Sequence, residues 1–108
     1  MAKRPSEIRR IIKRYTNELA RIGIRAERVM LYGSYAAGTA NDDSDIDLFI
    51  ISSDWDGFNQ RERLEMLGIA AARILEPVQA QGFTPQEIAN NQIPLFWEHV
   101  LQEQSVAI

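Results

Sequence analysis

Apolar side chains recur at helical spacing in three parts of this chain and predict three helices. The first spans about residues 7–22, the second 59–75 and the last 94–104. A shorter helix is expected from Thr84 to Asn90, because a capping box begins there and proline stands at the first helical position. The apolar stripe of the second helix consists of Leu64, Leu67, Ala71 and Ile74.

Three shorter segments have the pattern of β-strands. Residues 28–32 are a brief apolar run that ends at a glycine-serine turn signal, and residues 78–83 are the least apolar of the three. Residues 45–52 have two faces that are both apolar beyond Asp47, so this strand is expected at the centre of a sheet. The elements predict a mixed α/β fold (α+β), a small mixed sheet with flanking helices in the order α-β-β-α-β-α-α.

Length and composition are typical of one globular domain. The chain has 108 residues, of which 45% are hydrophobic and 25% charged, so we expect residues 1–108 to fold as a single unit. There is no cysteine, and the single His99 cannot form a zinc site alone. No apolar run approaches the ~20 residues of a membrane helix, and the first residues lack the pattern of a secretory signal. These features favour a cytoplasmic protein without a membrane partner.

Positive charge is concentrated near the start of the chain. Residues 1–28 hold nine of the 12 Lys and Arg but three of the 15 Asp and Glu, which gives +6 there and −9 in the remainder. Such a segment either binds phosphates or an acidic partner, or forms the solvent-exposed face of an amphipathic helix. Nucleic-acid binding through the first helix is therefore one functional alternative.

The most informative segment joins a glycine-serine turn to an acidic strand. Gly33 and Ser34 follow the strand at 28–32, and a residue without Cβ lets the backbone approach a phosphate closely. The turn after them points N–H groups at such a ligand, and Ser34 adds a hydroxyl donor. Ser44 is placed to tie down the loop before the next strand, and it is a candidate nucleotide-binding residue together with Gly33 and Ser34.

Asp45 and Asp47 are spaced so that both side chains leave the same face of that strand, with Cα atoms roughly 6.5–7 Å apart. Such carboxylates suit Mg²⁺, which is typically held by one or two acidic side chains together with substrate phosphates. Two like charges beside Phe49 and Ile51 repel each other unless a cation or other partners relieve them. Turn and strand together predict a site for a metal-bound triphosphate.

This segment resembles the signature of a known family. The run Gly33-Ser34, Ala36, Gly38, Ala40 and Asp43-Ser44-Asp45-Ile46-Asp47-Leu48 is similar to that of the polymerase-β-like nucleotidyltransferase superfamily, in particular the minimal nucleotidyltransferases of prokaryotes. The match of individual residues is confined to about residues 33–48. The resemblance implies a palm core in which Gly33 and Ser34 hold the triphosphate while Asp45 and Asp47 bind the catalytic Mg²⁺ or Mn²⁺.

The resemblance also implies a reaction and a partner. Family members transfer a nucleoside monophosphate from an NTP to a hydroxyl and release pyrophosphate. Many minimal members are encoded beside HEPN-domain proteins, and some act as antitoxins by adenylylating a tyrosine of that partner. The implied activity here is Mg²⁺-dependent transfer of AMP from ATP to a hydroxyl of a protein partner such as a HEPN toxin. The apolar last helix is compatible with a homo- or hetero-oligomer.

Two positions depart from the family pattern. Tyr35 stands where arginine is frequent, and Arg28 or another residue of the basic segment is expected to compensate. The family's third carboxylate should lie on the strand at 78–83, where Gln79 occupies about the expected place. Glu76 is the nearest substitute, although a solvent-facing position at a helix end explains it equally well. An amide does not hold Mg²⁺ as a carboxylate does, so the alternative is a weak or inactive transferase-like module that acts by binding a HEPN-type partner.

Overall fold

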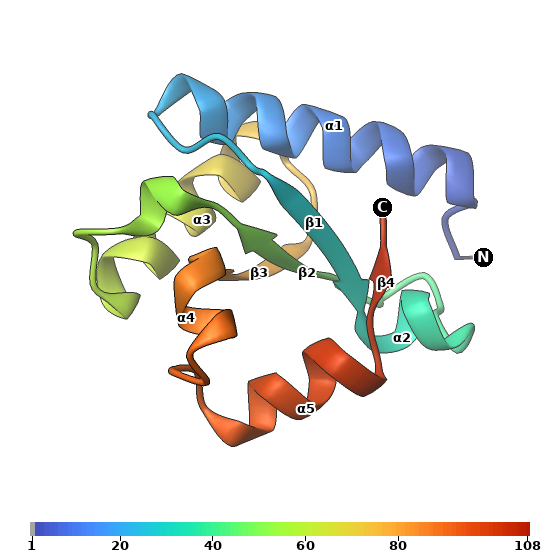
Figure 1. Ribbon diagram of the computed structural model, residues 1–108. Coiled ribbons are helices and arrows are strands. Elements are labelled where there is room, and N and C mark those ends of the chain that lie inside the picture. Colours follow the sequence, from blue (N-terminus) through green and yellow to red (C-terminus); the bar gives the residue numbers. More distant parts are fainter. Residues whose placement is uncertain (1) are drawn as a thin grey trace.

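A four-stranded mixed sheet runs through the middle of the computed structural model, which describes residues 2–108 (Figure 1). The strands are ordered β3-β2-β1-β4. β1 (Arg28–Tyr32) is antiparallel to both β2 (Ile46–Ile51) and β4 (Val106–Ala107), and β2 is parallel to β3 (Val78–Phe83). β2 therefore lies between two other strands, as its two apolar faces predicted.

Helices precede and separate the strands. They are α1 (Pro5–Arg21), α2 (Gly33–Ala37), α3 (Gln60–Ile74), α4 (Pro85–Ala89) and α5 (Leu95–Glu103), with a short 3₁₀ turn, η1 (Ser53–Trp55). Each predicted helix is present, with ends within two residues of those expected. The predicted order lacked α2 and β4, which are too short to produce a periodic pattern. No helix within residues 2–108 has the length and apolar character needed to cross a membrane.

α1 and α3 cover one face of the sheet, and α4 and α5 lie against the other (Figure 1). Beneath α1 and α3, the buried Ile46, Leu48 and Ile50 of β2 pack with apolar side chains of both helices. On the opposite face, Phe49 and Ile51 pack with apolar side chains from β3 and from the α4–α5 segment. The alternation predicted for β2 is confirmed, and it divides the apolar core into two layers.

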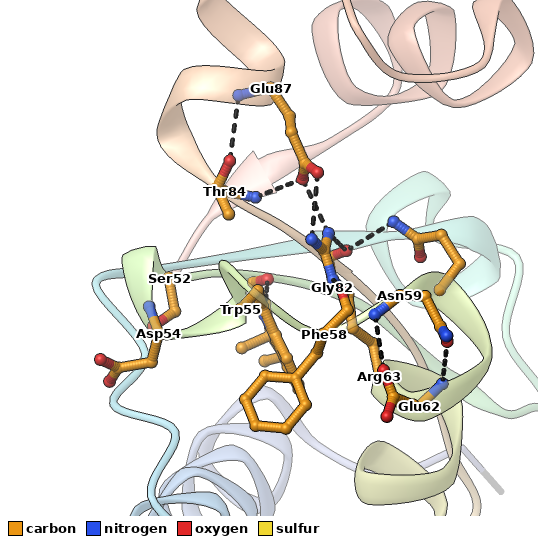
Figure 2. A network of polar contacts seen from close by, with 12 residues as sticks. Ser52, Asp54, Trp55, Phe58, Asn59, Glu62, Arg63, Gly82, Thr84 and Glu87 are labelled. Atoms are coloured by element: carbon orange, nitrogen blue, oxygen red, sulfur yellow. Dashed lines mark hydrogen bonds and ion pairs between the residues drawn. The ribbon is translucent and has the colours of Figure 1, made fainter.

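A polar network fixes α4 to α3 and β3 (Figure 2). The guanidinium of Arg63 in α3 donates to the two carboxylate oxygens of Glu87 in α4, over 2.7 and 3.0 Å, and also to the backbone carbonyl of Gly82. Glu87 accepts a further bond of 2.8 Å from the backbone N–H of Thr84. These bonds anchor the α4–α5 segment on the sheet face that carries Phe49.

That face is covered along only part of its length. Phe49 and Ile51 are buried completely, whereas Asp47 is half-buried and Asp45 is exposed. The transition occurs over successive side chains on the same face, from Asp45 just before β2 to Ile51 at its end. The open end of this face is where the two aspartates of the sequence motif lie.

Candidate nucleotide and metal site

The two aspartates share one face of the sheet. Asp47 lies in β2 directly opposite Tyr32 of β1, and Asp45 immediately precedes the strand. Ile46, between them, is fully buried on the other face beneath α1 and α3. The pKa of Asp47 is raised above its ordinary value, first by partial burial and second by the negative charge of Asp45. The two carboxylates are therefore close enough to repel each other.

Neither aspartate has a protein partner that relieves this repulsion. Within residues 2–108, no lysine, arginine or N–H group forms an ion pair or hydrogen bond with the carboxylate of Asp45 or Asp47. The carboxylate of Asp54, in contrast, accepts a bond of 2.9 Å from the backbone N–H of Arg25. Two unpaired, hard oxygen donors on one face form a set that fits Mg²⁺ or Mn²⁺.

Gly33 is packed directly against this acidic pair. A Cβ atom placed on Gly33 would lie 2.1 Å from Oδ2 of Asp47 and 3.0 Å from its Cγ, so no other residue fits while Asp47 keeps its position. The φ angle of Gly33 is 71°, in the left-handed region that glycine adopts readily. From the sequence, the glycine was expected only because a residue without Cβ lets the backbone approach a phosphate. The structure adds a second reason, because the turn and the acidic strand form one unit.

Ser34 lies between two hollows at the start of α2. A hollow of about 630 Å³ is lined by Gly33 and Ser34 on one side and by Gln104 and Ser105 on the other. A smaller one, of about 260 Å³, is lined by Ser34 together with residues of α1. Sequence reasoning missed the wall formed after α5. Its position depends on the pairing of β4 with β1, which leaves no local signal in the sequence.

Ser44 has the local role that its position predicted. Its hydroxyl accepts a bond of 2.8 Å from the backbone N–H of Asn41, and its own N–H donates to the Asn41 carbonyl over 3.2 Å. These bonds close the loop that leads into β2. The Ser44 hydroxyl therefore holds the loop that leads to Asp45 through its bond with Asn41.

The structure does not bring Glu76 to the aspartates. Its carboxylate lies 3.6 Å from the guanidinium of Arg14 in α1, which also donates to the backbone carbonyl of Ile74. Gln79 is the residue of β3 that pairs with Asp47, and its side chain is exposed. Across residues 2–108, no group of three or more His, Cys, Asp or Glu side chains is placed to share a metal ion.

Arg28 does not compensate for the missing arginine at position 35. It pairs with Ile51, at the end of the β1–β2 ladder opposite to Asp47, and its guanidinium lies 3.7 Å from the sulfur of Met30. The hydroxyl of Tyr35 instead accepts a bond of 3.2 Å from the backbone N–H of Lys3. The cations near this turn come from the start of the chain, where Lys3 and Arg9 line the smaller hollow.

Comparison with known proteins identifies a family and two similar structures. The family model described as "Polymerase beta, Nucleotidyltransferase" matches residues 7–102. A candidate nucleotidyltransferase from Sulfolobus solfataricus has a similar structure, with a TM-score of 0.58 and 22% identity over 99% of this chain and 89% of that one. A toxin-antitoxin structure with AMP-PNP is similar over 93% of this chain and 70% of its own, with a TM-score of 0.57 and 22% identity. Among curated proteins, none is a significant match in sequence.

The solved structures, at 22% identity, support the fold alone, whereas the family match extends over most of the sequence. The fold expected from the resemblance is confirmed: a mixed sheet flanked by helices, in which Asp45 immediately precedes, and Asp47 lies in, the strand that follows the glycine-serine turn. This chain belongs to the polymerase β nucleotidyltransferase family and is a nucleotidyltransferase.

Proposed function

We propose that this chain transfers AMP from ATP to a hydroxyl of a protein partner, in a reaction that depends on Mg²⁺ or Mn²⁺. The observation that carries the proposal is the pair Asp45 and Asp47, which lies on one sheet face against Gly33 without a partner of opposite charge in the described chain. Two carboxylates are kept in mutual repulsion there. A divalent cation bound with a nucleotide relieves that repulsion.

The residues have distinct roles in this proposal. Asp45 and Asp47 bind the cation, and Gly33 and Ser34 bind the triphosphate, with the Ser34 hydroxyl donating to a phosphate oxygen. When bound, Mg²⁺ neutralises charge on the phosphates and polarises their oxygens. The acceptor oxygen forms a bond to the α-phosphorus, and the bond from that phosphorus to the bridging oxygen breaks. Pyrophosphate leaves, and the proton of the hydroxyl is released.

A toxin of the HEPN class is the partner that we propose as acceptor, with this chain as its antitoxin. The proposal is supported by the family resemblance of residues 33–48 and by the similar toxin-antitoxin structure, whose nucleotide is the ATP analogue AMP-PNP. We place the reaction in the cytoplasm. The chain has no cysteine and so needs no disulfide bond, which is compatible with the reducing conditions there.

The test is transfer of label from α-labelled ATP in the presence of Mg²⁺ and the HEPN-type partner. Wild type should label the partner, and Asp45→Asn should abolish labelling. Asp56→Asn is the matched control, because Asp56 is an exposed turn residue just after η1. Equal labelling by wild type and Asp45→Asn would reject catalysis at this site.

A second candidate function is binding without catalysis. It is favoured by the exposed, neutral Gln79 next to Asp47. Calorimetry separates the two candidates. A module that acts by contact alone should bind its partner with the same affinity whether or not Mg²⁺ and ATP are present, and Asp47→Ala should not change that affinity.

Nucleic-acid binding is a third candidate function, and a separate observation supports it. Arg9 and Lys13 of α1 line one hollow together with Arg25 and Arg28, and none of these four side chains is paired with a carboxylate within residues 2–108. Binding to RNA at this surface should weaken steeply with salt. Reversal of charge at Arg9 and Lys13 should abolish it, and unchanged RNA binding would exclude this candidate.

A further inference from the structure

The neighbour of Asp47 on the adjacent strand is a neutral amide. β2 and β3 run parallel, and Asp47 pairs with Gln79. Paired residues of neighbouring strands share a face, and the strands lie about 4.8 Å apart. Val78 and Ala80, on either side of Gln79, are buried beneath α1 and α3, whereas Gln79 is exposed. The Gln79 side chain therefore stands beside the two carboxylates on the open face.

Within residues 2–108, no third Asp or Glu side chain is placed to share a metal ion with Asp45 and Asp47. Glu76, which lies two residues before β3, is held by Arg14 of α1. Among the described residues, the negative charge placed to bind a cation on this face therefore comes from Asp45 and Asp47.

Two divalent cations need more charge than this. In two-metal sites the ions lie about 3.5–4 Å apart, where their mutual repulsion must be offset by shared carboxylates. The amide oxygen of glutamine is able to ligate a hard cation, but it brings no charge. The phosphates of the nucleotide balance the cation that travels with them. A second cation would depend on Asp45 and Asp47, which already serve the first.

We propose that Gln79 limits this site to one divalent cation, the one bound together with the nucleotide. The inference rests on the proposed function, because it takes the nucleotide to bind at Gly33 and Ser34. Because no third carboxylate assists the acceptor hydroxyl, the proton of that hydroxyl passes to water or to a base of the acceptor protein. Transfer is therefore slow unless the acceptor supplies that base.

The test is a count of bound Mn²⁺ ions by electron paramagnetic resonance, at saturating AMP-PNP. Wild type should bind one ion per chain, and Gln79→Glu should bind two. Gln81→Glu is the matched control, because Gln81 lies two residues further along the same strand face, opposite Phe49, roughly 7 Å from Gln79. This control should still bind one ion. Gln79→Asp provides a second variant if Gln79→Glu does not fold.

The outcomes separate this inference from the function on which it rests. Two ions in wild type, or one ion in folded Gln79→Glu and Gln79→Asp, would overturn the role of Gln79 alone. A second ion in Gln81→Glu would also overturn it, since any added charge would then suffice. Failure of wild type to bind either Mn²⁺ or AMP-PNP better than Asp47→Asn would instead reject the proposed function itself.

Discussion

Polar side chains gather at both ends of the β2–β3 pair, and the two clusters differ in how their groups are satisfied. At the end where β3 finishes, Arg63 is 4% exposed, and its guanidinium donates to Glu87 and to the carbonyls of Phe58 and Gly82 (Figure 2). Throughout residues 2–108, no buried polar side-chain atom lacks a hydrogen-bond partner. This cluster is complete within the protein.

The cluster at the other end is incomplete. Asp45, Asp47 and Gln79 share a face, yet none of their side chains is paired with another described residue. Burial of a charge is costly unless the charge is paired, so a complete cluster stabilises the fold. Carboxylates that repel each other without a partner are costly to the fold, and they are retained where a ligand supplies the missing charge. The comparison separates structural charge from functional charge.

Neutralising one carboxylate of the incomplete cluster should have the largest effect. Asp47→Asn should lower the transfer rate by about three orders of magnitude, because a ligand of the cation contributes several kcal/mol, roughly 4, to the transition state. The free energy of unfolding should change by no more than about 0.5 kcal/mol, since no protein contact is lost. Pyrophosphate release and thermal unfolding measure the two effects. A large loss of stability would show that Asp47 is structural.

The complete cluster should respond in the opposite way. Arg63→Met keeps most of the side-chain volume but removes the ion pair with Glu87 and the bonds to the carbonyls of Phe58 and Gly82, so unfolding should become about 2–3 kcal/mol easier. Arg61→Met is the matched control, because Arg61 is 88% exposed and its pair with Glu65 is worth at most about 0.5 kcal/mol. Chemical denaturation measures both. Metal binding at Asp47 should be unchanged in each variant.

Substitution of two glycines tests the contact between Gly33 and Asp47 of the incomplete cluster. Gly33 and Gly38 both have positive φ, 71° and 78°, so alanine at either costs about 1–2 kcal/mol in backbone strain. A Cβ at Gly38 would meet nothing within 4 Å, whereas at Gly33 it would overlap the Asp47 carboxylate. Gly33→Ala should therefore also weaken Mn²⁺ binding, and Gly38→Ala should not. Equal Mn²⁺ affinity in the two variants would contradict the contact between Gly33 and Asp47.

The common face of Asp45 and Asp47 was predictable because a strand alternates with a period of two, and the positions of β1, β2 and β3 followed from short apolar runs. β4 was not predictable, because two residues have no period and become a strand only by pairing with Met30 and Leu31. Local pattern therefore located the acidic pair and missed the segment that lines the hollow beside Ser34.

Ion pairs between residues far apart in the chain were the second feature that the sequence pattern could not predict. The helical stripe placed Leu64 in the core, but Leu64 is 46% exposed, and the neighbouring Arg63 is buried in its place. Arg63 is tolerated there because Glu87, from another helix, compensates its charge. In the same way, the place of Glu76 in the sequence suggested a third carboxylate of the site, but its side chain lies against Arg14 of α1. Neither pairing has a signal in the local sequence.

The smallest predicted effect concerns the response of the complete cluster to acid. Arg63 and the N–H and hydroxyl groups of Thr84 hold the pKa of Glu87 below its ordinary value of 4.5, against the opposing effect of burial. The stabilisation from ionised Glu87 is therefore fully present above pH 4.5 and is lost as the pH falls through the lowered pKa. Glu87→Gln should reduce the free energy of unfolding at pH 7 by about 1 kcal/mol. The difference from wild type should vanish in strong acid, and a difference that persisted there would assign the effect to packing of the side chain.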